Sequence, residues 1–196
     1  RNLVEMVQFV KDCGAKSIKI EFCSTTFTNG HPSTEYMVDP RTLTEDIVKV
    51  FPELERITDG RIVLDMMVPL CIWPKGFIRE LYRKGRMLSV CHVHKRRGLI
   101  FDANGNVIMC NALFDYPLGQ FGTDFHDGNS LLTWLNSSKI RNYFDRIGAY
   151  PSPACKECQW YSECAGGCPL RWATYQPDGL VKAIDKPFDT REKRHD

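Results

Sequence analysis

The residues best suited to chemistry are four cysteines within one short segment of the chain. The segment reads Cys155-Lys-Glu-Cys158-Gln-Trp-Tyr-Ser-Glu-Cys164-Ala-Gly-Gly-Cys168, a spacing of C-x2-C-x5-C-x3-C. Packing does not require this pattern, because cores use cysteine as a small apolar residue at scattered positions. A metal does require it, since soft thiolates must converge, within about 2.3 Å of a zinc ion for example. Gly166 and Gly167 permit the tight turns that convergence needs. We therefore predict a metal site in residues 155–168.

The chain has nine cysteines in total, and an odd number argues against a complete set of disulfides. The clustered C-x2-C form indicates metal binding in a reducing compartment, so we expect a cytoplasmic protein. A disulfide knot and separate buried thiols are the alternatives. We interpret Cys13 and Cys23 as buried thiols.

The composition is that of an ordinary soluble globular protein, with 43% apolar and 26% charged residues. A length of 196 residues allows one large domain or two small ones. The net charge is only +2, and no run of about 18 apolar residues occurs. We therefore expect neither nucleic acid nor a membrane as a partner.

The elements of the first third alternate between helix and strand. Apolar residues at helical spacing over 3–10 predict a helix, and alternation over 17–23 predicts a strand. Asp39-Pro40 indicates the start of a second helix, which Pro52 is expected to end or kink. Residues 24–38 are predicted to be a loop, and 61–68 a buried strand. This order predicts parallel αβ units with a covered sheet.

The organisation changes after residue 71. A short helix is predicted over 76–84, and two apolar runs around Asn104-Gly105 predict a β-hairpin over 99–109. Cys91 precedes this hairpin and Cys110 ends it, so the hairpin can bring the two thiols together. Residues 115–130 read as a loop, and short helices are predicted over 131–135, after Ser137 and after Cys168. The fold class is therefore α+β.

The cysteines of the C-terminal half follow one combined pattern. It runs Cys91-x13-Gly105-x4-Cys110, a gap, and then the segment 155–168. In this pattern the chain resembles, over residues 90–190, the SPASM domain that follows the barrel of many radical SAM enzymes. Residues 1–70 are similar to the last βα units of the partial (β/α) barrel in such enzymes. The resemblance implies two domains, the barrel units over 1–88 and a cysteine-rich auxiliary domain over 89–196.

The resemblance also implies which cysteines share a site. In the family, the cysteines hold auxiliary 4Fe–4S clusters, so this chain would carry one or two. Matched by position, Cys91, Cys110 and Cys168 would ligate the cluster nearer the barrel. Cys155, Cys158 and Cys164 would ligate the farther cluster. Ligation would then stabilise a loop-rich domain that has little core of its own.

Two ligand positions depart from the family pattern. The family has a seventh cysteine after the segment, but no cysteine follows Cys168 here. Asp189 can take that position as a carboxylate ligand, or it is solvated and the farther cluster has an open or lost site. Cys71 is the candidate fourth ligand of the nearer cluster. The alternatives are that Cys71 is a buried thiol, or that the nearer cluster has an open iron that binds substrate.

The chain lacks the C-x3-C-x2-C loop that holds the cluster which cleaves S-adenosylmethionine. We therefore expect a C-terminal fragment that is inactive alone, rather than a stand-alone degenerate protein. The resemblance implies a parent that uses S-adenosylmethionine and a third cluster to modify a peptide or protein. The implied partners are that substrate and an electron donor such as a flavodoxin or ferredoxin.

Two non-enzymatic readings of the same residues are open. Four clustered thiolates also suit a structural zinc protein, although the added hairpin cysteines favour iron–sulfur. The strand edges of the hairpin also suit a peptide-binding module, a role compatible with the enzyme.

Overall fold

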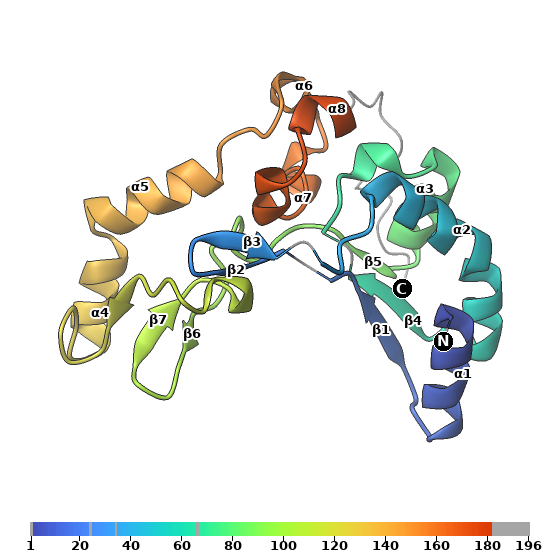
Figure 1. The fold of residues 1–196 in the computed structure, drawn as a ribbon, viewed down its shortest axis with the longest axis horizontal. Coiled ribbons are helices and arrows are strands. Elements are labelled where there is room, and N and C mark those ends of the chain that lie inside the picture. The colour runs from blue at the N-terminus through green and yellow to red at the C-terminus, as the bar shows by residue number, and fades with distance from the viewer. Residues whose placement is uncertain (1, 24, 34, 66, 182–196) are drawn as a thin grey trace.

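The computed structural model describes residues 2–23, 25–33, 35–65 and 67–181, and it has the predicted α+β composition. Figure 1 shows an elongated arrangement: helices α1 to α3 lie at one end, α4 and α5 lie at the other, and α6 to α8 lie between them. None of the helices in the described ranges combines the length and the apolar character needed to cross a bilayer.

The N-terminal end is built on a three-stranded parallel sheet in the order β1-β4-β5. Its elements are α1 (Leu3–Asp12), β1 (Ile18–Glu21), α2 (Pro40–Ile57), β4 (Ile62–Asp65), α3 (Lys75–Arg83) and β5 (Met87–Leu88). Ile18 pairs with Ile62, and Leu64 pairs with Met87. The three helices lie along one face of the sheet (Figure 1). The predicted parallel pairing of the first two long strands is confirmed.

Helix α2 begins where the sequence predicted and ends later. The Asp39 carboxylate accepts hydrogen bonds from the backbone N–H groups of Arg41 (2.9 Å) and Thr42 (3.1 Å), and Pro40 occupies the first turn. Pro52 lies inside the helix and does not end it, so the predicted end there is wrong, while the alternative of a kink stays a prediction. The apolar residues after it, Leu54 and Ile57, are buried in the core, and their burial offsets the hydrogen bond that proline removes.

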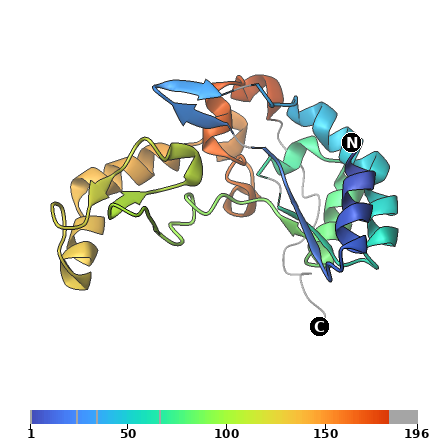
Figure 2. The same cartoon turned by 60° about the horizontal axis from the view of Figure 1, so that its bottom comes forward.

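A short hairpin replaces part of the loop that was predicted over 24–38. Strands β2 (Thr26–Thr28) and β3 (His31–Ser33) pair antiparallel and form a sheet of their own, outside the parallel sheet (Figure 2). Asn29 and Gly30 make the turn with φ angles of 50° and 81°. Asn-Gly is the dipeptide best suited to two positive φ angles, so the turn signal was present in the sequence.

The predicted hairpin around Asn104-Gly105 is confirmed. It comprises β6 (Ile100–Phe101) and β7 (Asn106–Ile108), and β8 (Gly119–Gln120) adds a third antiparallel strand. The Asp102 carboxylate accepts hydrogen bonds from the backbone N–H groups of Asn104 and Asn106 and so fixes the turn. A small core of Val107, Phe125, Trp134 and Ile140 packs this sheet against α4 (Gly128–Leu135) and α5 (Ser138–Ile147).

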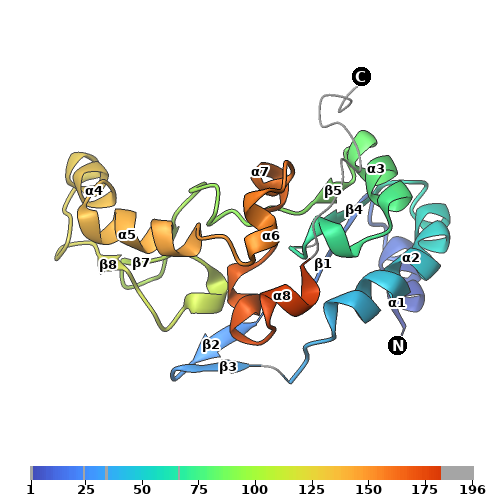
Figure 3. The same ribbon diagram turned by 90° about the horizontal axis from the view of Figure 1, so that it is seen from above.

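The cysteine segment lies between the two ends of the molecule (Figures 1 and 3). It contains α6 (Pro153–Lys156) and α7 (Tyr161–Cys164), and it leads into the 3-10 helix η3 (Pro169–Ala173) and α8 (Pro177–Leu180). Two further 3-10 turns are η1 (Leu70–Ile72) and η2 (Asn111–Leu113). Trp160 and Cys164 belong to the core of the N-terminal end, which also includes Leu70 and Trp73. The cysteine segment therefore packs on the parallel αβ unit.

Candidate functional site

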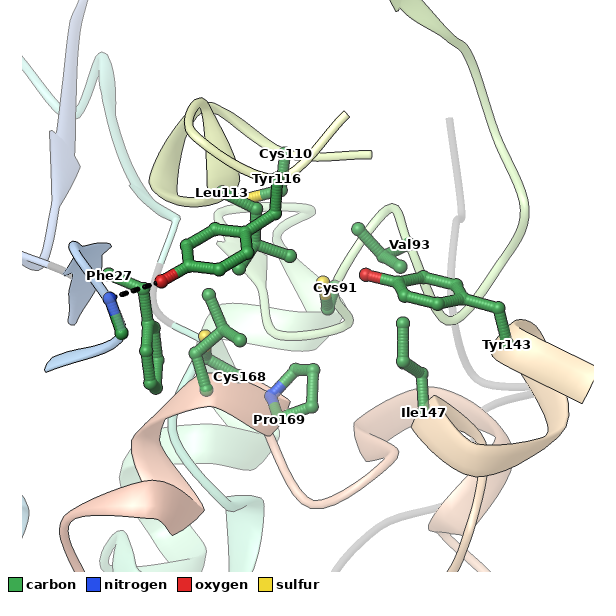
Figure 4. A pocket seen from close by; sticks show the side chains of 12 residues that line it. Phe27, Cys91, Val93, Cys110, Leu113, Tyr116, Tyr143, Ile147, Cys168 and Pro169 are labelled. Carbon is green, nitrogen blue, oxygen red and sulfur yellow. Dashed lines mark hydrogen bonds between the residues drawn. The ribbon is translucent and has the colours of Figure 1, made fainter. Parts of the chain in front are cut away.

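Three cysteines from distant parts of the chain lie around one cavity, and we call them the first thiol group: Cys91, Cys110 and Cys168. Cys91 follows β5, Cys110 follows β7 as the N-cap of η2, and Cys168 is the N-cap of η3. Cys91 and Cys168 are each only 6% exposed. The cavity measures about 310 Å³, and Figure 4 shows the sulfur atoms at its wall.

The rest of this cavity is apolar. Its other lining residues are Phe27, Gly30, Val93, Leu113, Tyr116, Tyr143, Ile147, Pro169 and Leu170. The Tyr116 hydroxyl accepts a hydrogen bond of 2.5 Å from the backbone N–H of Gly30, which holds the β2–β3 turn against the cavity (Figure 4). The missed hairpin is therefore part of the site, since it supplies Phe27 and Gly30 to the wall.

Four other cysteines lie around a second, smaller cavity, and we call them the second thiol group: Cys71, Cys155, Cys158 and Cys164. Cys155 is on α6, Cys158 is in the turn that follows, and Cys164 ends α7. Pro69, Ala154, Tyr161, Gly166 and Val181 complete the lining. The cysteine segment thus divides between two sites, because Cys168 faces the first cavity while its other three thiols face the second.

Cys71 is not where the sequence suggested. We expected it beside Cys91, Cys110 and Cys168, but it lies with the second group. The reason is the path of the chain after β4, where η1 packs against α7. There the backbone N–H of Leu70 donates a hydrogen bond of 3.3 Å to the Cys164 sulfur. Ligation of metal by either group stays a prediction.

Burial dominates the electrostatics of the first thiol group. It raises the pKa of the Cys91 thiol, an effect opposed by backbone N–H groups of Val93 and His94 that point at the sulfur. Burial likewise raises the pKa of the Cys168 thiol, and the backbone N–H of Leu170 opposes it. The Cys110 sulfur accepts a backbone hydrogen bond of 3.3 Å from Ala112. Each sulfur thus has a donor that favours the thiolate once a cation is present.

The second thiol group shows the same balance more strongly. Burial raises the pKa of Cys164 to about 12, against the lowering effect of backbone N–H groups from Leu70 and Gly166. The pKa of Cys155 is raised to about 11, mainly by burial and in smaller part by the neighbouring Cys71. Both thiols are therefore protonated near neutral pH without a cation, and metal binding would release their protons.

The spacing of the thiols bears on what they can hold. Within the described ranges, no group of three or more His, Cys, Asp or Glu side chains is arranged to hold a metal ion. Four thiolates on one zinc ion would have sulfur–sulfur distances of about 3.8 Å, given zinc–sulfur bonds of about 2.3 Å. The second group surrounds a space of about 20 Å³, little more than one water needs, so the volume does not distinguish a single ion from a cluster. By the chemistry of its donors, the set of four thiols fits either a zinc ion or an iron–sulfur cluster.

Arg171 is a buried cation beside Cys168 of the first thiol group, and sequence reasoning missed it. It is only 2% exposed, and its Nε has no hydrogen-bond partner among the described residues. One terminal nitrogen donates to the Cys23 carbonyl at 3.5 Å, and the Cys168 sulfur is close enough to act on its charge. A signal was present, because Arg171 is a lone cation in the run Pro-Leu-Arg-Trp-Ala directly after a cysteine.

Three further residues were considered from the sequence: Asp189, Cys13 and Cys23. Asp189 lies outside the described residues, so its expected role as a ligand stays a prediction. Cys13 and Cys23 are exposed, so the expectation that these thiols are buried was wrong.

Comparison with models of known protein families, with curated proteins and with solved structures gives no significant match to this chain.

Proposed function

We propose that this chain binds one or two auxiliary 4Fe–4S clusters and belongs to a radical SAM enzyme that modifies a peptide or protein. The observation that carries the proposal is the sorting of seven cysteines into two thiol groups around separate cavities. The grouping does not follow the order of the sequence, because Cys168 lies with Cys91 and Cys110 and not with the three cysteines that precede it. Chance burial of apolar thiols does not favour such an arrangement.

The local chemistry supports iron–sulfur ligation. Backbone N–H groups point at sulfurs in both groups, as they do at Cys110 and Cys164 (3.3 Å each), and hydrogen bonds of this kind tune cluster potentials. The apolar linings limit the contact of water with the buried cysteines, which are Cys91, Cys155, Cys164 and Cys168. Such clusters supply electron transfer, and with an open iron they also bind a ligand.

The cavity of the first thiol group supports a place for substrate. It has about 310 Å³ of space and only three thiols, so a cluster held there would leave one ligand position without a cysteine from the described residues. Phe27, Tyr116 and Tyr143 provide aromatic walls for an apolar side chain of a substrate peptide. These residues would bind and orient that side chain and exclude water from it.

The fold supports the same assignment for the N-terminal end. Parallel strands β1, β4 and β5 joined by α2 and α3 are the units from which a (β/α) barrel is built, so we propose that residues 1–88 are the last units of a partial barrel. Cleavage of S-adenosylmethionine needs the C-x3-C-x2-C loop, which is not in this sequence. We assign that step, and the flavodoxin- or ferredoxin-type electron donor, to the parent protein. Cytoplasm remains the expected location, because free thiols persist in a reducing compartment.

The identity of the bound metal tests the proposal. The chain is purified and reconstituted anaerobically with iron and sulfide in one sample and with zinc in another. We expect a brown protein with equal amounts of iron and sulfide, and an electron paramagnetic resonance (EPR) signal after reduction. A colourless protein that takes up only stoichiometric zinc would overturn the proposal. That outcome would favour the second candidate, a structural zinc protein, for which the four thiols of the second group are a suitable ligand set.

A further inference from the structure

We infer that Cys71 is the fourth thiolate ligand of the second thiol group, so that one cluster joins the parallel αβ unit to the cysteine segment. The inference rests on the proposed function and adds to it a ligand from outside the auxiliary domain. The sequence pattern gave no reason for this pairing, because Cys71 precedes the hairpin and lies far along the chain from Cys155.

The position of Cys71 supports this role directly. Cys71 is the central residue of η1, and it lines the same cavity as Cys155, Cys158 and Cys164. The cysteines of the first cavity are a different set. The second cavity therefore has four thiols, the number that a 4Fe–4S cluster takes.

Backbone contacts hold η1 in place independently of the Cys71 side chain. The Leu70 N–H donates to the Cys164 sulfur at 3.3 Å, one residue before Cys71. The Cys168 N–H donates to the Met67 carbonyl at 2.9 Å. Gly167 lies so close to Met67 that a Cβ atom added to Gly167 would be 2.6 Å from the Met67 carbonyl oxygen. The approach of the two segments is thus built into the chain, and it carries Cys71 to the thiols.

With four thiolate ligands at the second thiol group, the two sites would also have different roles. A site closed by four protein ligands suits electron transfer or a structural role, whereas a site with an open position suits ligand binding. The second thiol group is closed by Cys71 and needs no carboxylate from Asp189. The first thiol group keeps three cysteines and borders the larger cavity, so an exogenous ligand is expected to perturb its cluster only.

The test compares cluster content in single and combined variants of the full chain. Cys71→Ala, Cys71→Ser and the pair Cys155→Ala/Cys158→Ala are reconstituted anaerobically, and iron, sulfide and EPR spectra are measured. Cys13→Ala is the matched control, because Cys13 is an exposed cysteine at the end of α1. Asp189→Ala tests the carboxylate that the sequence suggested.

We expect Cys71→Ala to lose about half of the iron and the same EPR component that the Cys155/Cys158 pair loses. Adding Cys71→Ala to that pair should cause no further loss. Cys71→Ser should keep its iron and shift that component, because a hydroxyl oxygen can replace the sulfur, and this variant guards against a simple failure to fold. Cys13→Ala and Asp189→Ala should match the wild type.

Two results would overturn the inference while leaving the proposed function intact. In one, Cys71→Ala and Cys71→Ser keep both components unshifted. In the other, they lose the EPR component that the Cys155→Ala/Cys158→Ala pair retains. A wild-type chain that binds no iron would instead overturn the proposed function.

Discussion

At the scale of single residues, Arg171 is the charge that distinguishes the first site. Its guanidinium is buried without a carboxylate partner among the described residues, and it lies near the Cys168 sulfur. An unpaired buried cation is costly unless an anion compensates it. Thiolates around the proposed iron–sulfur cluster would supply that anion, and the cluster would then stabilise the buried guanidinium.

Replacing this charge should change the redox potential of one cluster. We expect Arg171→Met to lower the potential of the cluster at the first thiol group by tens of millivolts, on the order typical of a changed nearby charge, because the reduced cluster is more negative. The potential is measured by EPR-monitored titration. Arg79→Met, which removes an exposed arginine on α3, is the control and should leave both potentials unchanged. An unchanged potential in Arg171→Met would contradict the assigned role.

At the scale of elements, the close contact between the cysteine segment and residues 67–68, which follow β4, depends on Gly167. Its φ of +82° lies in the left-handed region, and a Cβ would meet the Met67 oxygen at 2.6 Å and the Met67 carbonyl carbon at 3.0 Å. The positive φ would strain any residue other than glycine, and the added Cβ would push the Met67 backbone away. Both thiol groups adjoin this contact, since Cys164 and Cys168 flank it.

Gly167→Ala should therefore lower stability more than a glycine substitution with the same backbone strain alone. Gly122 is the matched control, because its φ is +87° and a Cβ added there would have no other atom within 4 Å. We expect about 1 kcal/mol of lost stability for Gly122→Ala and about 2 kcal/mol more for Gly167→Ala. Urea midpoints of the reconstituted chains measure the difference. Equal midpoints would show that the contact contributes little.

The sequence predicts those elements whose signals are local in the chain, and it misses features that tertiary packing decides. Helices α1 and α2 and strands β1 and β4 follow from local periodicity and from the Asp39-Pro40 cap, and the β6–β7 hairpin follows from Asn104-Gly105. The β2–β3 hairpin was missed because strands of three residues are too short to show alternation. The place of Cys71 and the burial of Arg171 were missed because tertiary packing, not spacing, decides them.

At the scale of the whole molecule, the cysteine segment lies between two separately packed cores and belongs to one of them. Trp160 and Cys164 belong to the N-terminal core, while Val107 and Ile140 centre the other core. The Ser89 hydroxyl adds a buried link, since it donates to the Glu163 carbonyl at 2.9 Å. Clusters at the two thiol groups would tie together segments that share little apolar surface.

Removal of iron should loosen these links and leave the parallel sheet intact. We expect a chelator to increase amide hydrogen exchange in residues 67–72 and 155–168, because cluster bonds would no longer hold the segments together. The β1–β4 amides, which pair within the sheet, serve as the internal reference. Exchange that rises equally in both regions, or in neither, would contradict a linking role for the clusters.

The most direct test of two separate cluster sites is the iron and sulfide content of two complementary variants. One variant carries Cys91→Ala, Cys110→Ala and Cys168→Ala, and the other carries Cys155→Ala, Cys158→Ala and Cys164→Ala. We predict that each retains about half of the wild-type iron, and that their Mössbauer spectra sum to the wild-type spectrum. A single variant that loses all the iron, or one that loses none, would contradict the division of the cysteines into two sites.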